Sequence, residues 1–173
     1  LYGGTGNDRL YGDDDRDRLY GDEGNDRLNG EGRVFGGDGR DRIEGSPGFV
    51  RGGADIDFIS VGASGSDRVI VRGDSGNDRI TTDLIDGDPD FRLFGGGGND
   101  QIAFYGGVDQ TSGMVFGDHG DDSIIAFVGE DWAGTINGGS GHATLRDIRG
   151  PSAATRTGGS GADLPAGGIT AAV

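Results

Sequence analysis

Aliphatic residues recur along this chain at short, regular intervals rather than in long apolar runs. Leu10, Leu19 and Leu28 stand nine residues apart, and each of them directly follows an Arg. Alternation over so few residues predicts short β-strands in which one side chain points inward and its neighbours point outward. The segments between them are rich in Gly and Asp, which are typical of tight turns. The pattern therefore predicts an all-β chain.

The strands belong to a nine-residue unit that recurs along most of the sequence. Copies start at residues 3, 12, 21, 36, 52, 62, 73, 95, 117, 138 and 158. Of these 11 units, ten carry Asp at the sixth position and ten carry an aliphatic residue at the eighth, with Ala143 and Pro165 as the exceptions. Two units make one coil of turn, strand, turn and strand. Coils stacked about 4.8 Å apart would pair each strand in parallel with its copy in the next coil.

The coil length changes along the chain. One series of turns starts at residues 3, 21, 36, 52, 73, 95, 117, 138 and 158, so successive coils grow from 15–18 residues to 20–22. The irregular residues fall on the other side of the coil, for example at 87–91 and 106–113. We therefore predict a parallel β-roll, a β-solenoid of about eight coils, with one regular and one irregular edge. Residues 1–146 would form the roll, and residues 147–173, which lose the alternation, a degenerate or disordered tail.

Composition indicates what holds such a roll together. Gly supplies 40 of the 173 residues and only 32% are hydrophobic, so a conventional core would struggle to offset the ordering entropy. The net charge of −15 argues against nucleic acid or an anionic membrane as a partner. No apolar run reaches the ~18 residues of a membrane span, so we expect no stable membrane insertion. Cations fit this chain much better.

The repeat positions suggest how a cation would be bound. Gly at the first and fourth positions, and often at the second, is expected to adopt positive φ and to turn the carbonyl groups inward. The sixth-position Asp, such as Asp26 or Asp78, would add a carboxylate beside those carbonyls. That is the oxygen-only environment that Ca²⁺ prefers. The alternatives are a solvated acidic linker, which would lack the aliphatic residue two places after each Asp, and a metal-free β-solenoid, which would have no use for inward carboxylates.

These units follow the pattern G-G-x-G-x-D-x-aliphatic-x, with Asn at the fifth position in residues 7, 25, 77 and 99. The chain therefore resembles the RTX family of haemolysin-type calcium-binding repeats over residues 1–146. The resemblance implies a right-handed parallel β-roll that holds several Ca²⁺ ions between consecutive turns of one edge. It implies Asp ligands on the regular edge at Asp8, Asp26, Asp41, Asp57, Asp78, Asp100 and Asp122, with Asp17 and Asp67 opposite. The Gly residues assigned to these sites are Gly3, Gly21, Gly24, Gly36, Gly39, Gly52, Gly73, Gly76, Gly95, Gly98, Gly117 and Gly120.

Some positions depart from the pattern. Asp15 and Asp55 replace the fourth-position Gly, which would strain the turn or add a ligand. Ala143 removes a carboxylate, so the site that uses its turn should be weak or empty. Arg occupies the seventh position in residues 9, 18, 27, 42, 68 and 79. We expect these Arg side chains to form one outward stripe that screens the Asp column, with an anionic-glycan site as the alternative.

The leading functional hypothesis is a calcium-triggered folding module of a larger exported protein. RTX proteins are exported by type I secretion machinery and fold outside the cell, which implies an extracellular location. The alternatives are part of a secreted protease, lipase or polysaccharide-modifying enzyme with its catalytic domain upstream, a self-associating adhesin or matrix protein, and a pore-forming toxin. The residues given are not expected to be catalytic, because the GDSG string at 73–76 lies within the repeat and His119 and His142 are the only His.

Overall fold

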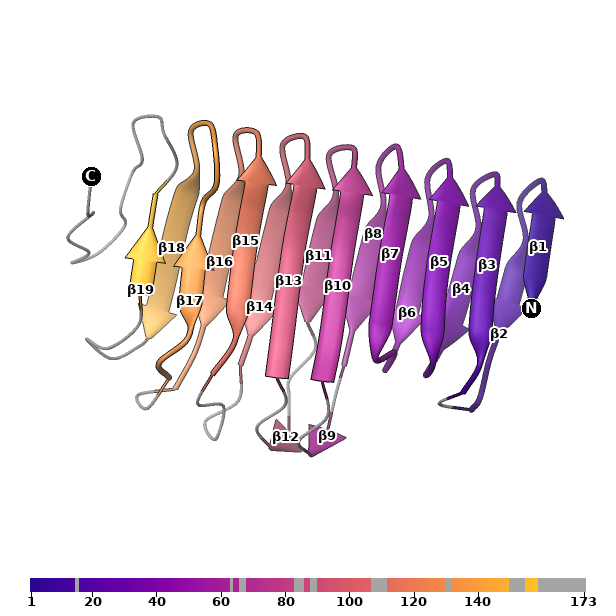
Figure 1. The fold of residues 1–173 in the computed structure, drawn as a ribbon, viewed down its shortest axis with the longest axis horizontal. Helices are drawn as coiled ribbons and strands as arrows, with labels where there is room; N and C mark the ends of the chain where they lie inside the picture. The colour runs from indigo at the N-terminus through magenta and orange to yellow at the C-terminus, as the bar shows by residue number, and fades with distance from the viewer. Residues whose placement is uncertain are drawn as a thin grey trace.

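The chain winds between two parallel β-sheets that face each other (Figure 1). The fold is seen in a computed structural model that describes residues 1–14, 16–62, 64–65, 68–82, 86–87, 90–106, 112–129, 132–149 and 155–158. All the regular secondary structure in these ranges is β-strand. These ranges contain no helix that is long and apolar enough to cross a membrane. The all-β prediction is confirmed.

Sheet A has nine strands, in the order β1-β3-β5-β7-β10-β13-β15-β17-β19, and sheet B has eight, in the order β2-β4-β6-β8-β11-β14-β16-β18. Sheet A consists of β1 (Tyr2–Thr5), β3 (Arg18–Glu23), β5 (Arg33–Asp38), β7 (Phe49–Ala54), β10 (Arg68–Ser75), β13 (Asp90–Gly97), β15 (Met114–His119), β17 (Thr135–Asn137) and β19 (Thr155–Thr157). Sheet B consists of β2 (Arg9–Tyr11), β4 (Arg27–Gly30), β6 (Arg42–Gly45), β8 (Phe58–Val61), β11 (Arg79–Thr82), β14 (Gln101–Tyr105), β16 (Ser123–Phe127) and β18 (Thr144–Arg149). The short strands β9 (Ser64–Gly65) and β12 (Asp86–Gly87) form a separate pair. Each strand pairs in parallel with its copy in the next coil, so the chain is a parallel β-roll.

The strand register confirms the predicted coil starts. Asp22 pairs with Gly37, Gly53 with Asp74, and Asp74 with Gly96, so the same repeat position recurs at the same height in every coil. Coils of 15 and of 22 residues can share one register because the extra residues lie on the opposite edge, where β9 and β12 also lie (Figure 1).

Aliphatic side chains from both sheets fill the interior. The eighth-position residues Leu28, Ile43 and Ile102 are at most 1% exposed, as the alternation predicted. Trp132, in an irregular segment of the opposite edge, is fully buried and packs 6.2 Å from Phe104, measured between ring centroids. It belongs to the hydrophobic core. Large aromatic side chains thus occupy the interior where the coils become longer.

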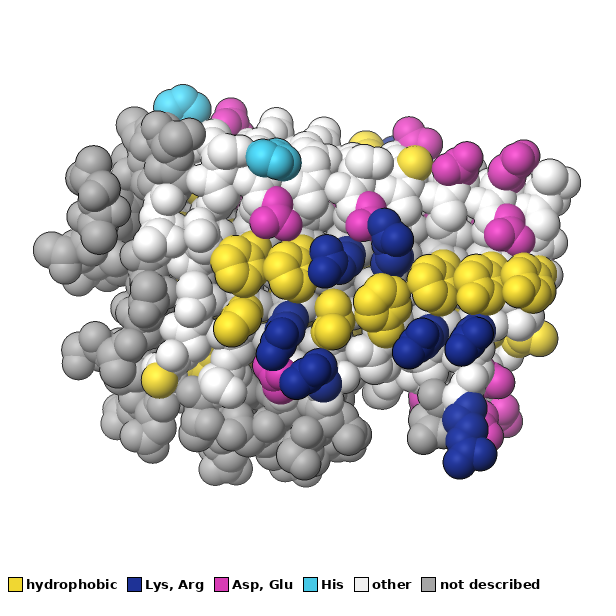
Figure 2. Space-filling model, viewed as in Figure 1, with side chains coloured by type: hydrophobic (Ala, Val, Ile, Leu, Met, Phe, Trp, Pro, Cys, Tyr) yellow, Lys and Arg dark blue, Asp and Glu magenta, His cyan; other side chains and the backbone are white. Residues whose placement is uncertain are grey.

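The outer face of sheet A carries a line of aromatic side chains (Figure 2). Tyr2 stacks on Tyr20 with ring centroids 4.7 Å apart, and Tyr20 stacks on Phe35 at 4.8 Å. Phe94 and Phe116 stack in the same way at 5.3 Å. Such stacking follows directly from an in-register parallel sheet, because equivalent residues lie one above the other.

The roll continues past residue 146. Strand β18 ends at Arg149 and pairs with β16, and β19 pairs with β17. The rest of the predicted tail, at 150–154 and 159–173, lies outside the described residues. The domain boundary at residue 146 therefore stays a prediction.

Candidate metal-binding edge

One edge of the roll consists of six-residue turns that lead from each sheet A strand to the next sheet B strand. We call it the regular edge, and its turns begin at Gly3, Gly21, Gly36, Gly52, Gly73, Gly95, Gly117 and Gly138. These are the narrow turns along the top of Figure 1. The sixth position of each turn immediately precedes a sheet B strand, so all the sixth-position Asp residues are stacked at one height.

The backbone of these turns is left-handed at the second and fourth positions. At the second position φ is 121° in Gly37 and 72° in Asp22, and at the fourth it is 110° in Gly39 and 137° in Gly24. The prediction of positive φ at the first position was wrong, since no first-position Gly of the regular edge has it. Two left-handed residues separated by one other are enough to reverse the chain.

The first-position Gly is needed for space instead. A Cβ atom on Gly36 would collide with Asp41 Oδ2 of its own turn and with the carbonyl oxygen of Gly52 in the next coil. The same two kinds of oxygen crowd the first-position Gly of the other turns from Gly21 to Gly117. A carboxylate oxygen and a carbonyl oxygen from two consecutive coils therefore meet beside each of these α-carbons.

Consecutive sixth-position Asp residues are linked by hydrogen bonds. The main-chain N–H of Asp26 donates to Asp41 Oδ1, and that of Asp41 donates to Asp57 Oδ1, both at 2.8 Å. The same bond joins the other members at 2.8–2.9 Å, so that the series Asp8, Asp26, Asp41, Asp57, Asp78, Asp100 and Asp122 is unbroken. We call this series the Asp ladder. Seven of the nine predicted Asp ligands are thus brought together in one row.

The second oxygen of each ladder carboxylate is buried without a partner. Oδ2 of Asp8, Asp26, Asp41, Asp57, Asp78, Asp100 and Asp122 makes no hydrogen bond. Six of these residues, all but Asp8, are at most 2% exposed. A buried carboxylate oxygen that faces carbonyl oxygens is costly unless a cation or a proton compensates it.

Burial therefore raises the pKa of the six ladder carboxyl groups from Asp26 to Asp122. Desolvation is the main cause, and the charges of neighbouring Asp residues add to it. The pKa rises to about 7 in Asp41, about 8 in Asp57, about 6 in Asp78 and about 7 in Asp100. The hydrogen bond from the preceding Asp N–H opposes the rise but does not cancel it. Without a cation, the ladder cannot be fully ionised at neutral pH at low cost.

The oxygen atoms of this edge fit a hard divalent cation. A ladder Oδ2 atom and a backbone carbonyl oxygen of the next coil both lie beside the first-position Gly, and such oxygen atoms match the ligand preference of Ca²⁺. Within the described ranges, no three His, Cys, Asp or Glu side chains converge to hold a metal by themselves. A metal site at this edge would therefore need backbone carbonyls as further ligands, and the assignment of these ligands stays a prediction.

Two further features of the turns were not predicted. Asn25 Oδ1 accepts a hydrogen bond from the main-chain N–H of Arg40 at 2.8 Å, and Asn7 Oδ1 accepts one from Asn25 in the same way. The run of Asn at the fifth position was the available signal for this second ladder. Asp74 and Asp118 occupy left-handed second positions with φ of 75° and 71°, where Gly stands in most other coils.

Several departures from the repeat have a clear outcome. Asp55 does adopt a strained left-handed backbone, with φ of 72°. Ala143 is buried in the slot that Asp occupies in the other coils. Asp17 approaches Gly12 within its own turn, but the next turn of that edge, at residues 30–33, lacks the motif. Asp67 and Asp15 lie outside the described residues.

The seventh-position Arg residues do not form a single stripe. Arg9, Arg27, Arg42 and Arg79 lie on sheet B, whereas Arg18 and Arg68 lie on sheet A. The ion pairs among the described residues join Arg42 to Glu44, Arg51 to Asp74, and both Arg68 and Arg92 to Asp90. None involves the Asp ladder, so these pairs do not provide the predicted screening.

Comparison with known families agrees with this geometry. The RTX calcium-binding nonapeptide repeat matches in four copies, at residues 2–32 and 92–110. The chain carries RTX repeats. No curated protein and no solved structure matches it. The matched segments contribute Asp8, Asp26 and Asp100 to the Asp ladder, and the strand register aligns the coils between them with these segments.

RTX repeats imply that this chain binds calcium. The parallel β-roll that they form here is a repeat module. The chain is therefore a calcium-binding repeat module.

Proposed function

We propose that this module folds when it binds several Ca²⁺ ions along the regular edge. The observation that carries the proposal is the row of seven buried Oδ2 atoms that lack a partner. Asp8, Asp26, Asp41, Asp57, Asp78, Asp100 and Asp122 would supply carboxylates, and the turn residues Gly3, Gly21, Gly24, Gly36, Gly39, Gly52, Gly73, Gly76, Gly95, Gly98, Gly117 and Gly120 would supply or make room for carbonyl oxygens.

Calcium would compensate the charge that burial makes costly. Each ion supplies two positive charges and binds oxygen ligands only. Without it, neighbouring ladder carboxylates repel each other, and the modest apolar interior has too little surface to hold the coils together. Metal binding and folding then become one process, as in other small domains whose sites do not exist in the unfolded chain.

Folding is expected to be cooperative along the roll. The Oδ2 of one coil lies beside the carbonyl of the next, so a site is complete only when two consecutive coils are stacked. Each coil contacts only its neighbours, and the stability of such arrays is governed by nearest-neighbour interfaces. A calcium titration should therefore show one steep transition rather than a series of independent steps.

The same coupling suits a protein that is exported and folds outside the cell. Extracellular calcium modules bind in the range of about 10⁻⁴–10⁻³ M. A chain tuned to that range would stay loose inside the cell and fold on exit, in keeping with type I secretion of a larger protein. The extracellular location is part of this proposal and is supported by the repeat type and the acidic composition.

Circular dichroism during a calcium titration tests the proposal. We expect little β signal in EGTA and a steep gain of β signal when calcium is added in excess. Magnesium at the same concentration is the control, since it demands a smaller octahedral site and keeps its waters. A β signal that is already complete in EGTA and unchanged by calcium would contradict calcium-dependent folding.

A further inference from the structure

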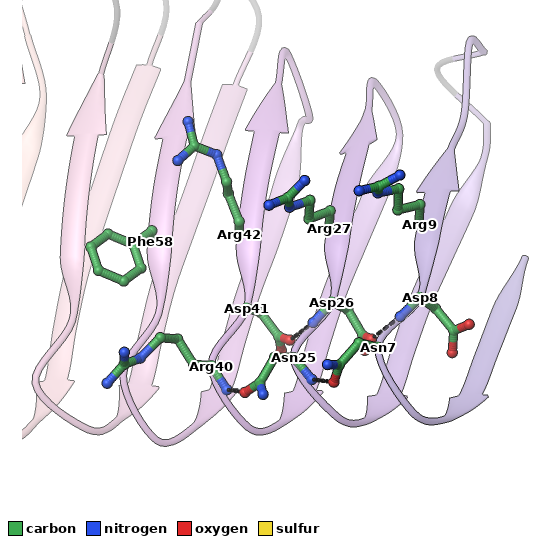
Figure 3. A pocket seen from close by; sticks show the side chains of 10 residues that line it. All are labelled: Asn7, Asp8, Arg9, Asn25, Asp26, Arg27, Arg40, Asp41, Arg42 and Phe58. Atoms are coloured by element: carbon green, nitrogen blue, oxygen red, sulfur yellow. Dashed lines mark hydrogen bonds between the residues drawn. The ribbon is translucent and has the colours of Figure 1, made fainter.

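A shallow trough runs along the outer face of sheet B, beside the regular edge. It has a volume of about 530 Å³ and lies between two rows of side chains (Figure 3). One row consists of Arg9, Arg27 and Arg42, which are in register on β2, β4 and β6. The other consists of Asn7, Asn25 and Arg40 in the adjoining turns.

The side chains that line the trough are mainly hydrogen-bond donors. The Oδ1 atoms of Asn7 and Asn25 already accept main-chain N–H groups, so these amides can offer their own N–H groups to a ligand. The Arg side chains can only donate. The acids that line the trough, Asp8, Asp26 and Asp41, have their Oδ2 atoms buried. A ligand that fits this trough must therefore be rich in acceptors.

The Arg row is incompletely neutralised by the protein itself. Arg9 and Arg27 form no ion pair with any residue in the described ranges, while Arg42 pairs with Glu44 at 2.6 Å on the surface. In-register pairing places the α-carbons of these Arg residues one strand spacing, about 4.8 Å, apart. Like charges stacked directly across strands destabilise a sheet. A bound row of anionic groups would compensate the repulsion between these Arg side chains.

An exposed aromatic ring continues the Arg row. Phe58 pairs with Arg42 on one side and with Arg79 on the other, and it is 40% exposed. A second hollow, of about 180 Å³, adjoins it and is lined by Arg42, Phe58 and Arg79. The trough thus extends over five consecutive coils, with an apolar surface between cationic ones.

We propose that this trough binds a linear carboxylated polysaccharide. Carboxylates recur at regular intervals along such a chain, as the Arg residues do along the trough, so several carboxylates of one chain can meet Arg residues. Arg binds carboxylate through paired N–H donors, and the apolar face of a sugar ring can pack on Phe58. A nucleic acid fits less well, because the chain has a net charge of −15 and the trough has no second aromatic side chain for base stacking.

Isothermal titration calorimetry with a short oligogalacturonate, in excess calcium and at low salt, tests this site. The R9Q/R27Q variant removes two trough charges and should weaken binding about five- to tenfold. The R18Q/R33Q variant is the matched control: it removes the same charge from the neighbouring strands β3 and β5 on the opposite face. It should bind like the unmodified chain. Phe58→Ala should also weaken binding.

Circular dichroism of every variant in calcium separates this test from that of calcium-dependent folding. The site is refuted if the unmodified chain is folded in calcium but does not bind the oligogalacturonate. Equal weakening in R9Q/R27Q and R18Q/R33Q would show unspecific charge attraction instead. Binding that is as tight to neutral dextran, or tighter to single-stranded oligothymidylate, would overturn the assignment to a carboxylated polysaccharide.

Discussion

Replacing one ladder carboxylate by an amide should have opposite effects with and without calcium. Asp41→Asn keeps the Oδ1 acceptor for the N–H of Asp26. It replaces the unpartnered Oδ2 by an N–H donor beside the carbonyl oxygen of Gly52. The amide should therefore stabilise the metal-free roll. In calcium, the same change removes a predicted ligand and should weaken binding. Asp38→Asn, an exposed Asp in the same turn, is the matched control.

The size of the effect follows from the pKa of Asp41. Burial raises this pKa from 3.8 to about 7. A shift of about three units corresponds to about 4 kcal/mol, which is the upper limit of what the ionised group costs the metal-free roll above pH 7. Relaxation and the response of neighbouring carboxylates reduce it. We expect a stabilisation of about 1–4 kcal/mol at pH 8 in EGTA.

The assay needs a metal-free roll that is partly populated. Trimethylamine N-oxide can promote folding of the chain in EGTA, because this osmolyte favours burial. The Asp41→Asn variant should fold at a lower osmolyte concentration than the unmodified chain, and at a higher calcium concentration when no osmolyte is present. If it destabilised the roll equally in EGTA and in calcium, the Asp ladder would be a purely structural element and the assignment of Asp41 as a ligand would fail.

Three other results are expected. Lowering the pH from 8 to 5 in EGTA should stabilise the roll, because ladder groups such as Asp57, with a pKa raised to about 8, bind more protons in the folded than in the unfolded chain. The calcium affinity should fall over the same pH range. A stability of the metal-free roll that rises with pH would contradict this reasoning. Gly95→Ala should destabilise the calcium form by about 1–3 kcal/mol in urea unfolding, because its Cβ would collide with Asp100 Oδ2 and the carbonyl oxygen of Gly117. Gly97→Ala is the control, since the nearest neighbour of its Cβ would be 3.9 Å away. Equal effects of the two changes would refute the spatial role of the first-position Gly. The fluorescence of Trp132, which is fully buried, should shift to the blue as calcium is added and return on addition of EGTA. A spectrum that calcium leaves unchanged would show that the folding of this part of the core does not depend on calcium binding.

Periodicity made the stacking of this chain predictable. The sixth and eighth positions recur at fixed spacing, so the sequence was enough to place Asp41 in a turn and Ile43 in the core, and to align the coil starts. The repeat does not predict the burial of Trp132, since the segment around it does not belong to the repeat. The irregular edge remains the part that the repeat does not specify.

Other features depend on three-dimensional contacts that the pattern does not contain. Gly occupies the first, second and fourth positions alike, so its occurrence cannot distinguish a residue that needs positive φ, such as Gly37, from one that needs space, such as Gly36. Arg9 and Arg18 have the same repeat position, yet they lie on opposite sheets because consecutive nonapeptides form the two sides of one coil. A linear pattern merges such residues into one stripe.

The comparison of the fifth and sixth positions gives the strongest argument for a metal. At the fifth position Asn25 accepts an N–H group from the next coil through Oδ1, and at the sixth position Asp41 accepts one from the preceding coil in the same manner. An amide therefore satisfies the hydrogen-bond requirement of such a ladder. At the buried sixth position, where an amide would avoid the cost of a charge, the chain carries Asp in seven consecutive coils. Hydrogen bonding does not account for that choice, whereas a cation that binds the second carboxylate oxygen does.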